Sequence, residues 1–354
     1  MNTIVCLEPW GGGGISKRDT GFGNRIIDWA ILYYISTLLE DCELLVQEEY
    51  WPELEFISLP KTKVTTMSSN EIRKKFPKLT SSHILNILRS NDGSSIQNSK
   101  YLGWYSEEYT MSSISSDKSS FSMKSILSSG IKDIKFKDEK VNKFFKDRFS
   151  DFSSIHLRRG LGTIPTLGFL NEYFSYNKEI LKSYLKNYYV DSINLGYLPM
   201  IGNYGFFIIP DTVYFSIIED IISKNKDHKI YISSDISEDY YSHYFEKYPD
   251  NIVSKNQYID EFLNLFEYDE TKVKTYKYSL KQTLINLFDM FVLAHSKTLI
   301  LDRDSTWGQV AFLIGEEKTK IDTIQYILHK ECISFNQFKV KYKFVVCRSL
   351  TCDS

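Results

Sequence analysis

Short apolar runs of strand character alternate along this chain with longer segments of helical periodicity, and this rhythm limits the possible folds more than any other feature. Residues 3–9 (TIVCLEP) are strand-like, residues 25–40 continue as an apolar helix, and residues 42–47 (CELLVQ) are again strand-like. A strand, a helix and a strand in this order are typical of a Rossmann-like domain, because parallel strands need a crossover helix between them. We therefore predict an α/β fold with parallel sheets.

The same alternation returns after a serine-rich stretch at 105–130, whose composition is that of a loop or linker. Because 354 residues exceed what one ordinary core fills, we predict two Rossmann-like domains, residues 1–147 and 148–354. In the second domain we expect helices at 212–223, 279–296 and 305–315, and strands at 153–160, 229–235 and 297–302.

The composition argues against several classes of protein. A net charge of −2 leaves no basic surplus to neutralise phosphates, so we expect no nucleic-acid partner. The chain has no uncharged apolar run of 18 residues and no N-terminal signal-peptide pattern, so we expect no membrane span. Its five cysteines are scattered and odd in number, which fits a reducing compartment. We therefore expect a soluble, cytoplasmic protein.

The segment SSIHLRRG at 153–160 carries the most informative chemistry. Its apolar residues alternate with polar ones and lead directly into Arg158 and Arg159. Ligands of open α/β sheets bind at the carboxyl ends of the strands, and arginine offers a planar, permanently charged fork that matches phosphate oxygens. The segment predicts a phosphate site, although an arginine pair on a solvated strand end would have the same sequence.

Three further segments carry polar groups that such a site needs. GFGN at 21–24 precedes the first helix, SSD at 233–235 ends a strand, and DRDST at 302–306 leads into a helix. A helix N-terminus at Ser305 would complete a diphosphate cradle with the two arginines. The carboxylate of Asp235 could accept two N–H groups from guanine. If the last three strands share one sheet, their carboxyl ends converge on one ligand.

Several of these residues also have a plain structural role open to them. Helix N-caps favour Asn, Asp, Ser and Thr, so Asn24 and Asp304 would cap the helices that follow them. Asp211 or Thr212 would cap the next helix in the same way. His156, on an alternating strand, would be a core histidine bonded to backbone.

Together the motifs resemble those of the GDP-fucose-dependent fucosyltransferases, in order and rough spacing, over about residues 3–315. The early glycine turn of that family is matched by Gly21, Phe22, Gly23 and Asn24, its H-x-R-R motif by His156, Leu157, Arg158 and Arg159, its [ST]-D pair by Ser234 and Asp235, and its serine-containing helix start by Ser305 and Thr306.

The resemblance implies a GT-B fold, in which two Rossmann-like domains with parallel sheets face each other. Residues 1–147 would form the acceptor-side domain and residues 148–354 the domain that binds the GDP-sugar. It also implies an inverting transfer of fucose from GDP-fucose to a glycan or glycoprotein acceptor, without a metal or another cofactor. Arg158 takes the role of the residue most needed for activity, since it holds the diphosphate. The implied donor-binding residues are His156, Arg159, Ser234, Asp235, Asp304, Ser305, Thr306, Gly21, Gly23 and Asn24.

The chain departs from the family pattern directly after the two arginines. Gly160 and Leu161 stand where many members have a further residue and an aspartate. The nearest carboxylates downstream are Glu172 and Glu179, and neither is close behind the arginines. The general base is therefore unassigned.

Three other functions fit parts of the same pattern. Asp302 and Asp304 spell D-x-D, so a metal-dependent glycosyltransferase of the other architecture is an alternative. The G-x-G at 21–23 would suit an NAD-dependent oxidoreductase, but Ile26 stands where a third glycine is expected. The third alternative is a non-catalytic module that binds a nucleotide sugar or a glycan, and the intact Arg158 argues against it.

Overall fold

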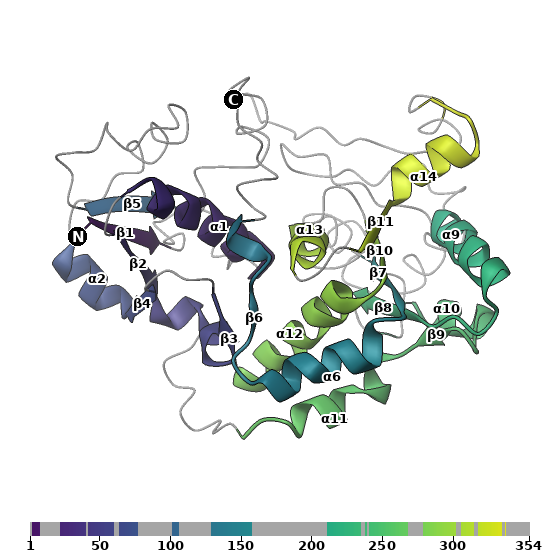
Figure 1. Ribbon diagram of the computed structural model, residues 1–354, viewed down its shortest axis with the longest axis horizontal. Helices are drawn as coiled ribbons and strands as arrows, with labels where there is room; N and C mark the ends of the chain where they lie inside the picture. Colours follow the sequence, from purple (N-terminus) through teal and green to yellow (C-terminus); the bar gives the residue numbers. More distant parts are fainter. Residues whose placement is uncertain are drawn as a thin grey trace, which may run out of the picture. The chain divides into compact units, whose positions relative to one another are not determined.

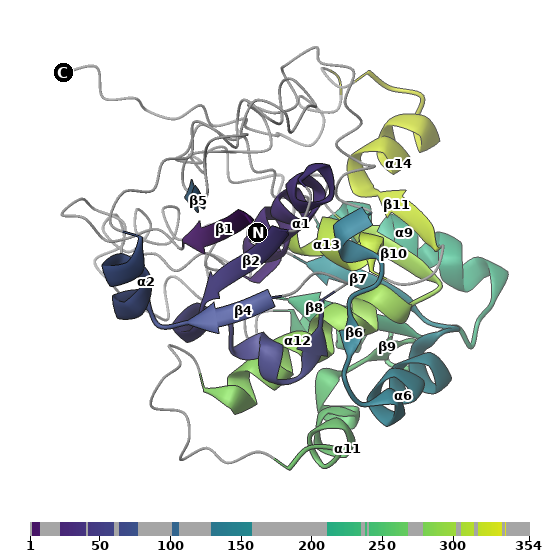
Figure 2. The ribbon, with the colours of Figure 1, turned by 60° about the vertical axis from the view of Figure 1, so that its left-hand side comes forward.

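The structure, a computed structural model, contains two α/β units, each with its own parallel sheet (Figures 1 and 2). The predicted α/β class with parallel sheets is therefore confirmed. The first unit comprises Met1–Lys146, Ile259–Ala294 and Leu313–Glu316, and the second comprises Asp147–Tyr258, His295–Phe312 and Glu317–Ser354. Because neither unit is continuous in sequence, the domains 1–147 and 148–354 stay a prediction. The residues described are 2–7, 22–39, 42–59, 64–76, 101–105, 129–157, 211–234, 238, 241–267, 279–301, 306–314, 318–334 and 337.

The sheet of the first unit has the strand order β4-β2-β1-β5, and every neighbouring pair is parallel. Ile4 and Val5 are both fully buried. Because successive strand residues point to opposite faces, both faces of the central strand are covered. Helix α1 packs on β1 and β2, while Val5 packs with Ile72 of α2. The bounds are β1 (Asn2–Leu7), α1 (Phe22–Leu38), β2 (Cys42–Gln47), β4 (Val64–Met67), α2 (Ser69–Lys75) and β5 (Tyr101–Tyr105).

A cluster of phenylalanine rings joins distant segments of the first unit. Phe136 of β6 lies 4.4 Å from Phe291 of α12, measured between ring centroids, and Phe262 of α11 lies 5.1 Å from Phe288. Aromatic pairs at such distances contribute about 0.5–1.5 kcal/mol beyond the area that they bury. The elements that carry the cluster are β6 (Lys135–Phe136), α6 (Glu139–Phe149), α11 (Ile259–Leu263) and α12 (Leu280–His295). Strand β3 (Ile57–Ser58) pairs with β6, and the short helices η1 (Glu48–Tyr50) and η2 (Pro52–Glu55) precede β3.

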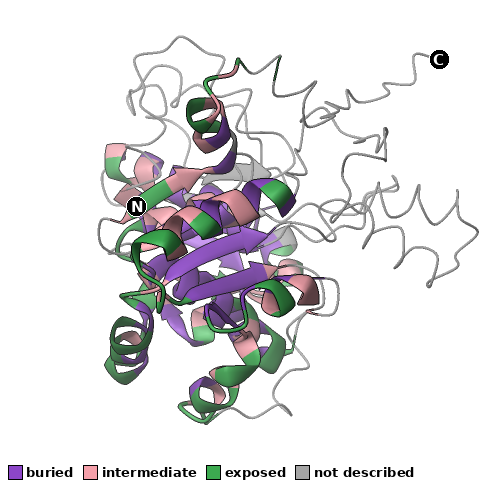
Figure 3. Ribbon diagram, turned by 90° about the vertical axis from the view of Figure 1, so that its right-hand side faces the viewer, coloured by how far each residue is buried: buried purple, intermediate pink, exposed green. Residues whose placement is uncertain are grey.

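The sheet of the second unit has the order β11-β10-β7-β8-β9 and is parallel throughout. Its central strand, β7, is buried at all five positions, and Figure 3 shows buried strands beside helices whose outer faces are exposed. The strands are β7 (Ser153–Leu157), β8 (Ile230–Ser234), β9 (Ile252–Val253), β10 (Thr298–Leu301) and β11 (Thr319–Asp322).

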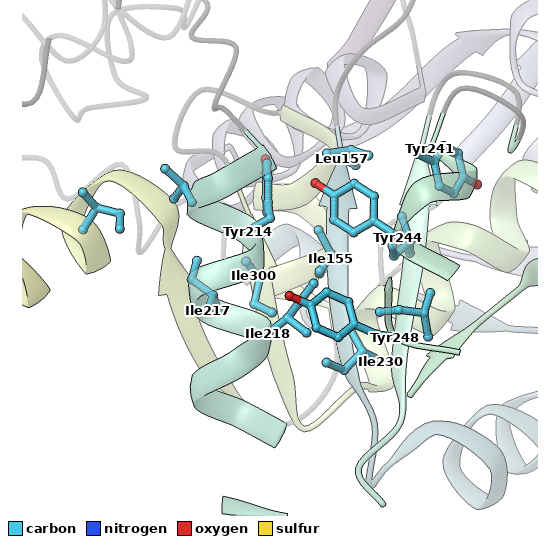
Figure 4. Packing of buried hydrophobic residues seen from close by; sticks show 14 residues of the cluster. Ile155, Leu157, Tyr214, Ile217, Ile218, Ile230, Tyr241, Tyr244, Tyr248 and Ile300 are labelled. Atoms are coloured by element: carbon cyan, nitrogen blue, oxygen red, sulfur yellow. The ribbon is translucent and has the colours of Figure 1, made fainter. Parts of the chain in front are cut away.

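Helices α9 (Asp211–Lys224), α10 (Ser242–Lys247) and α14 (Thr323–Lys330) contribute to the core of the second unit. Tyr214 and Ile217 of α9 pack with Ile155 of β7 and Ile230 of β8 in one buried cluster (Figure 4). The remaining elements of this unit are the short helix η7 (Lys255–Gln257) and α13 (Thr306–Leu313). No helix among the described residues is long and apolar enough to cross a membrane.

The predicted caps at Asn24 and at Asp211 or Thr212 are wrong. Helix α1 begins at Phe22, whose side chain is buried, so Asn24 already lies in the first turn. Helix α9 begins at Asp211, so Asp211 and Thr212 are both helical residues. The Asp211 carboxylate is instead engaged by two side chains of another helix, as described below. The predicted loop at 105–130 lies outside the described residues, except for its ends.

Candidate functional site

The three central strands of the second unit end side by side at one edge of the sheet. Strand β7 lies between β10 and β8, and all three run parallel. His156 is opposite Leu301 on one side and Ser233 on the other, and Leu157 is opposite Ser234. The expectation that these strands share one sheet is confirmed. The chain therefore leaves the sheet at adjacent points where it enters the segments that begin with Arg158, Asp235 and Asp302.

The predicted charged residues follow directly on these strand ends. Arg158 and Arg159 come after β7, Asp235 comes after β8, and Asp304 and Ser305 come after β10. All five lie outside the described residues, so their contacts stay predictions. The first residue of each segment directly follows the last residue of its strand in the sequence.

Ser234 ties two of these strand ends together. Its hydroxyl donates a hydrogen bond of 2.7 Å to the carbonyl oxygen of Leu157, the last residue of β7. The side chain thus reinforces the pairing of β7 and β8 at its last residue pair, and Leu157 directly precedes Arg158 in the sequence. Ser234 was predicted as a donor-binding residue from its place in SSD, and that role stays a prediction.

His156 lies in the centre of the sheet and is 5% exposed. Ile155 and Leu157 on either side belong to the cluster that packs with α9. Because strand side chains alternate, His156 points to the opposite face. Its burial fits the structural reading of a core histidine, and the predicted contact with guanosine stays untested.

Helix α13 begins at Thr306, and four residues separate it from Leu301, the end of β10. This confirms the predicted helix after the DRDST segment. A helix that starts so soon after a strand presents its unpaired N-terminal N–H groups near the carboxyl edge of the sheet, where an anion would be stabilised. The side chain of Thr306 lies outside the described residues.

The GFGN segment belongs to the first unit and enters α1. Gly21 lies outside the described residues, Phe22 and Gly23 are buried in the first turn, and the side chain of Asn24 is not described. The roles predicted for Gly21, Gly23 and Asn24 in donor binding are therefore untested.

A buried ion pair next to this segment was not predicted from the sequence. The Arg25 guanidinium contacts the Glu53 carboxylate of η2, and their side chains are only 2% and 7% exposed. Arg25 also lies 5.7 Å from the ring centroids of both Phe22 and Trp51. Burial raises the pKa of Glu53, while the neighbouring Arg25 charge opposes that rise. The signal in the sequence was a charged residue, Arg25, in a largely apolar helix.

A second buried polar cluster, also missed, lies in the second unit. Asp211, 1% exposed, accepts a hydrogen bond of 2.7 Å from the Tyr244 hydroxyl through Oδ1. Its Oδ2 lies 2.9 Å from His243 Nε2. Tyr244 is fully buried. The cluster joins the first turn of α9 to α10, and its partners lie too far apart in sequence for a local pattern to indicate them.

No family model and no curated protein matches this chain. Among solved structures it is similar to NodZ α1,6-fucosyltransferase co-crystallised with GDP, with a TM-score of 0.42 and 11% identity over 90% of this chain and 95% of that one. It is similar to NodZ from Bradyrhizobium, with a TM-score of 0.40 and 13% identity over 90% and 96% of the chains. It is also similar to POFUT1 in complex with GDP-fucose, with a TM-score of 0.42 and 13% identity over 91% and 97%.

Proposed function

We propose that this chain is a fucosyltransferase that moves fucose from GDP-fucose to a glycan hydroxyl. The observation that carries the proposal is the register of β10, β7 and β8, whose ends adjoin at one edge of a parallel sheet. The DRDST, HLRR and SSD segments begin at those ends. Each motif alone is short enough to arise by chance, but chance does not favour their convergence on the edge where α/β sheets bind ligands.

The proposed reaction is a displacement at the anomeric carbon. The acceptor oxygen forms a bond to that carbon, the bond to the diphosphate oxygen breaks, and the configuration inverts. The acceptor proton goes to a base that remains unassigned. Arg158 and the N-terminus of α13 stabilise the charge that develops on the departing GDP, which is the electrostatic contribution that typically dominates such catalysis. Fixed positive charge of this kind takes the place of a metal ion.

Within this proposal, His156 and Asp235 contact the guanosine, Arg159 supports donor or acceptor binding, and Ser305 and Thr306 contact the phosphates. The proposal includes a GT-B arrangement in which the first unit supplies the acceptor side. It also includes a cytoplasmic location, the compartment expected from the scattered and odd-numbered cysteines of the sequence.

Calorimetry with GDP, UDP, ADP and NAD tests the donor. We expect the wild type to bind GDP in preference to the others. Asp235→Asn should weaken GDP binding, because a mismatched buried donor or acceptor costs about 1–3 kcal/mol. A preference for UDP would contradict the guanine role of Asp235, and binding of NAD alone would favour an oxidoreductase. Release of GDP from GDP-fucose, measured with and without glycan acceptors, then tests the transfer.

A further inference from the structure

Lys318 lies against the last turn of α13 in the second unit. Its Nζ donates a hydrogen bond of 3.0 Å to the carbonyl oxygen of Ala311, a residue that is fully buried. Lys318 itself is half-buried, so part of the residue stays accessible to solvent. The amine is therefore partly withdrawn from water, at the border between the core and the solvent.

The surroundings of this amine favour its neutral form. Burial lowers the pKa of Lys318 from 10.5 to about 7, because the charged form loses hydration. A carboxylate partner has the opposite effect at Lys330, where the hydrogen bond of 2.8 Å to Asp220 raises the pKa. The bond from Lys318 to the Ala311 carbonyl joins it to an uncharged group. Near pH 7 a large share of Lys318 is therefore the free amine, which is the nucleophilic form of a lysine.

The position of Lys318 is well defined by the sheet. It directly precedes Thr319, the first residue of β11, so it lies at the amino end of that strand. The backbone N–H of Thr319 donates a hydrogen bond of 3.0 Å to the carbonyl oxygen of Lys297, the residue before β10. The nucleotide is proposed to bind at the carboxyl ends of these parallel strands. Lys318 is therefore at the opposite edge of the same sheet and belongs to a separate site.

We infer that Lys318 is a site of covalent N-acylation by small activated acyl groups, such as acyl phosphates and thioesters. The lone pair of Nζ attacks the acyl carbon, and a bond forms between nitrogen and carbon. The bond from the acyl carbon to the phosphate oxygen or the thiol sulfur breaks, and the leaving group keeps its electron pair. Nζ releases one proton to water, so the step needs no further reactant.

The half-buried position of Lys318 favours an uncharged product. An amide carries no charge, and its remaining N–H can still donate to the Ala311 carbonyl. A carbamate formed with carbon dioxide would place negative charge beside the carbonyl end of α13, which is unfavourable. The iminium formed with an aldehyde would keep a positive charge in a partly desolvated place, which also costs free energy. Acylation is the modification that avoids both costs.

Lys229 supplies a matched control in the same sheet. It directly precedes Ile230, the first residue of β8, and its Nζ donates a hydrogen bond of 2.6 Å to the carbonyl oxygen of Asp250. Lys229 is exposed, whereas Lys318 is half-buried. The two lysines thus share their place before a strand and their kind of hydrogen bond, and they differ in burial.

The test treats the full-length chain with acetyl phosphate at pH 7 and follows each lysine by proteolysis and mass spectrometry. About half of Lys318 is neutral at this pH, whereas an ordinary lysine is neutral in under about 0.1% of molecules. Restricted access offsets much of this difference, so we expect Lys318 to be acetylated about tenfold faster than Lys229. In denaturing urea the two rates should become equal. Lys318→Met should remove the fast site and leave the rate at Lys229 unchanged.

The comparison has two outcomes that overturn the inference. Acetylation of Lys318 at the rate of Lys229 or more slowly, in the folded chain, shows that the site is not activated. An advantage of Lys318 that persists in urea shows that its reactivity does not come from burial against α13. A fast site at Lys318 that is lost on unfolding supports the inference.

Discussion

The hydroxyl of Ser234 donates a hydrogen bond of 2.7 Å to the carbonyl oxygen of Leu157, the residue that precedes Arg158. Parallel pairing of β7 and β8 brings Leu157 opposite Ser234, and the side chain adds a contact where both strands end. The last residue of β7, which directly precedes the arginine pair in the sequence, is therefore held partly by a residue of the SSD motif. Two motifs that were recognised separately in the sequence are joined by one bond.

Ser234→Ala should lower the free energy of unfolding by about 1 kcal/mol, because the Leu157 carbonyl loses its hydroxyl partner. It should also weaken GDP binding, since Arg158 follows that carbonyl directly. Ser234→Thr keeps a hydroxyl and should retain most of both properties. Urea denaturation and calorimetry on the three proteins check this, and an alanine variant with unchanged stability would contradict the role given to the bond.

Arg158→Ala should reduce kcat for fucose transfer roughly 100- to 1000-fold, the usual effect of removing one donor to developing negative charge. Arg158→Lys should recover little, because an ammonium cannot make the planar bidentate contact. Arg148 is exposed on α6 and provides the control. Steady-state rates of the three variants test the assignment. Near-wild-type turnover in Arg158→Ala would remove Arg158 from the catalytic role.

Arg25→Met should destabilise the chain by about 3–5 kcal/mol, because it leaves the buried Glu53 carboxylate without its cation. The double variant Arg25→Met, Glu53→Gln should recover part of that loss, since neither charge then remains buried. Glu139 pairs with Lys135 at 3.8 Å, but the side chains are 80% and 63% exposed. Glu139→Gln should therefore change stability by less than about 0.5 kcal/mol. Denaturant unfolding of the wild type, Arg25→Met, Glu53→Gln and the double variant measures the coupling, and additive single effects would contradict it.

Lys318 predicts a pH dependence of stability. Its ammonium donates to the carbonyl oxygen of Ala311 at 3.0 Å, and burial lowers its pKa from 10.5 to about 7. At pH values between about 7 and 10.5, the Lys318 side chain is protonated in the unfolded chain and neutral in the folded chain. The contribution of Lys318 to the free energy of unfolding therefore rises with pH in this window, by at most about 1.4 kcal/mol per unit. This contribution is lost as the pH falls through about 7, because Lys318 then becomes protonated in the folded chain as well.

Lys318→Met should remove that slope and gain stability relative to wild type at pH 7 and below. Lys320→Met, at an exposed position of β11, is the control and should keep the wild-type slope. Unfolding free energies between pH 6 and pH 9 make the comparison. Parallel curves for wild type and Lys318→Met would show that burial does not depress the pKa of Lys318.

The elements with strong local patterns could be predicted from the sequence. Strand β2 was placed with its observed bounds, and α12 within one residue at each end, because apolar periodicity and flanking polar residues mark them. That β7, β8 and β10 share one sheet also followed from the alternation of strands and helices. Helix α9 was also placed within one residue at each end, although its predicted cap is a helical residue. The start of α1 was misplaced, since the helix already begins at the buried Phe22, before the predicted cap Asn24.

The buried polar pairs could not be predicted, because they depend on contacts between distant segments. Arg25 and Glu53 are 28 positions apart, and Asp211 and Tyr244 are 33 apart. No local pattern says which buried charge meets which partner. At the candidate site the sequence indicated the charged residues, and the structure adds the strand register and the Ser234 bond that bring their segments together.

The most direct test of the proposal is the melting temperature with GDP in excess EDTA. Because Arg158, Arg159 and the α13 N-terminus are proposed to hold the diphosphate, we predict stabilisation without any metal. A ligand at 100 times its dissociation constant contributes about 2.7 kcal/mol, which a thermal shift resolves. Arg158→Ala should lose most of the shift, and NAD should give none. Stabilisation by GDP only with Mn²⁺ or Mg²⁺ would instead assign the diphosphate to the D-x-D of Asp302 and Asp304 and contradict the metal-independent site.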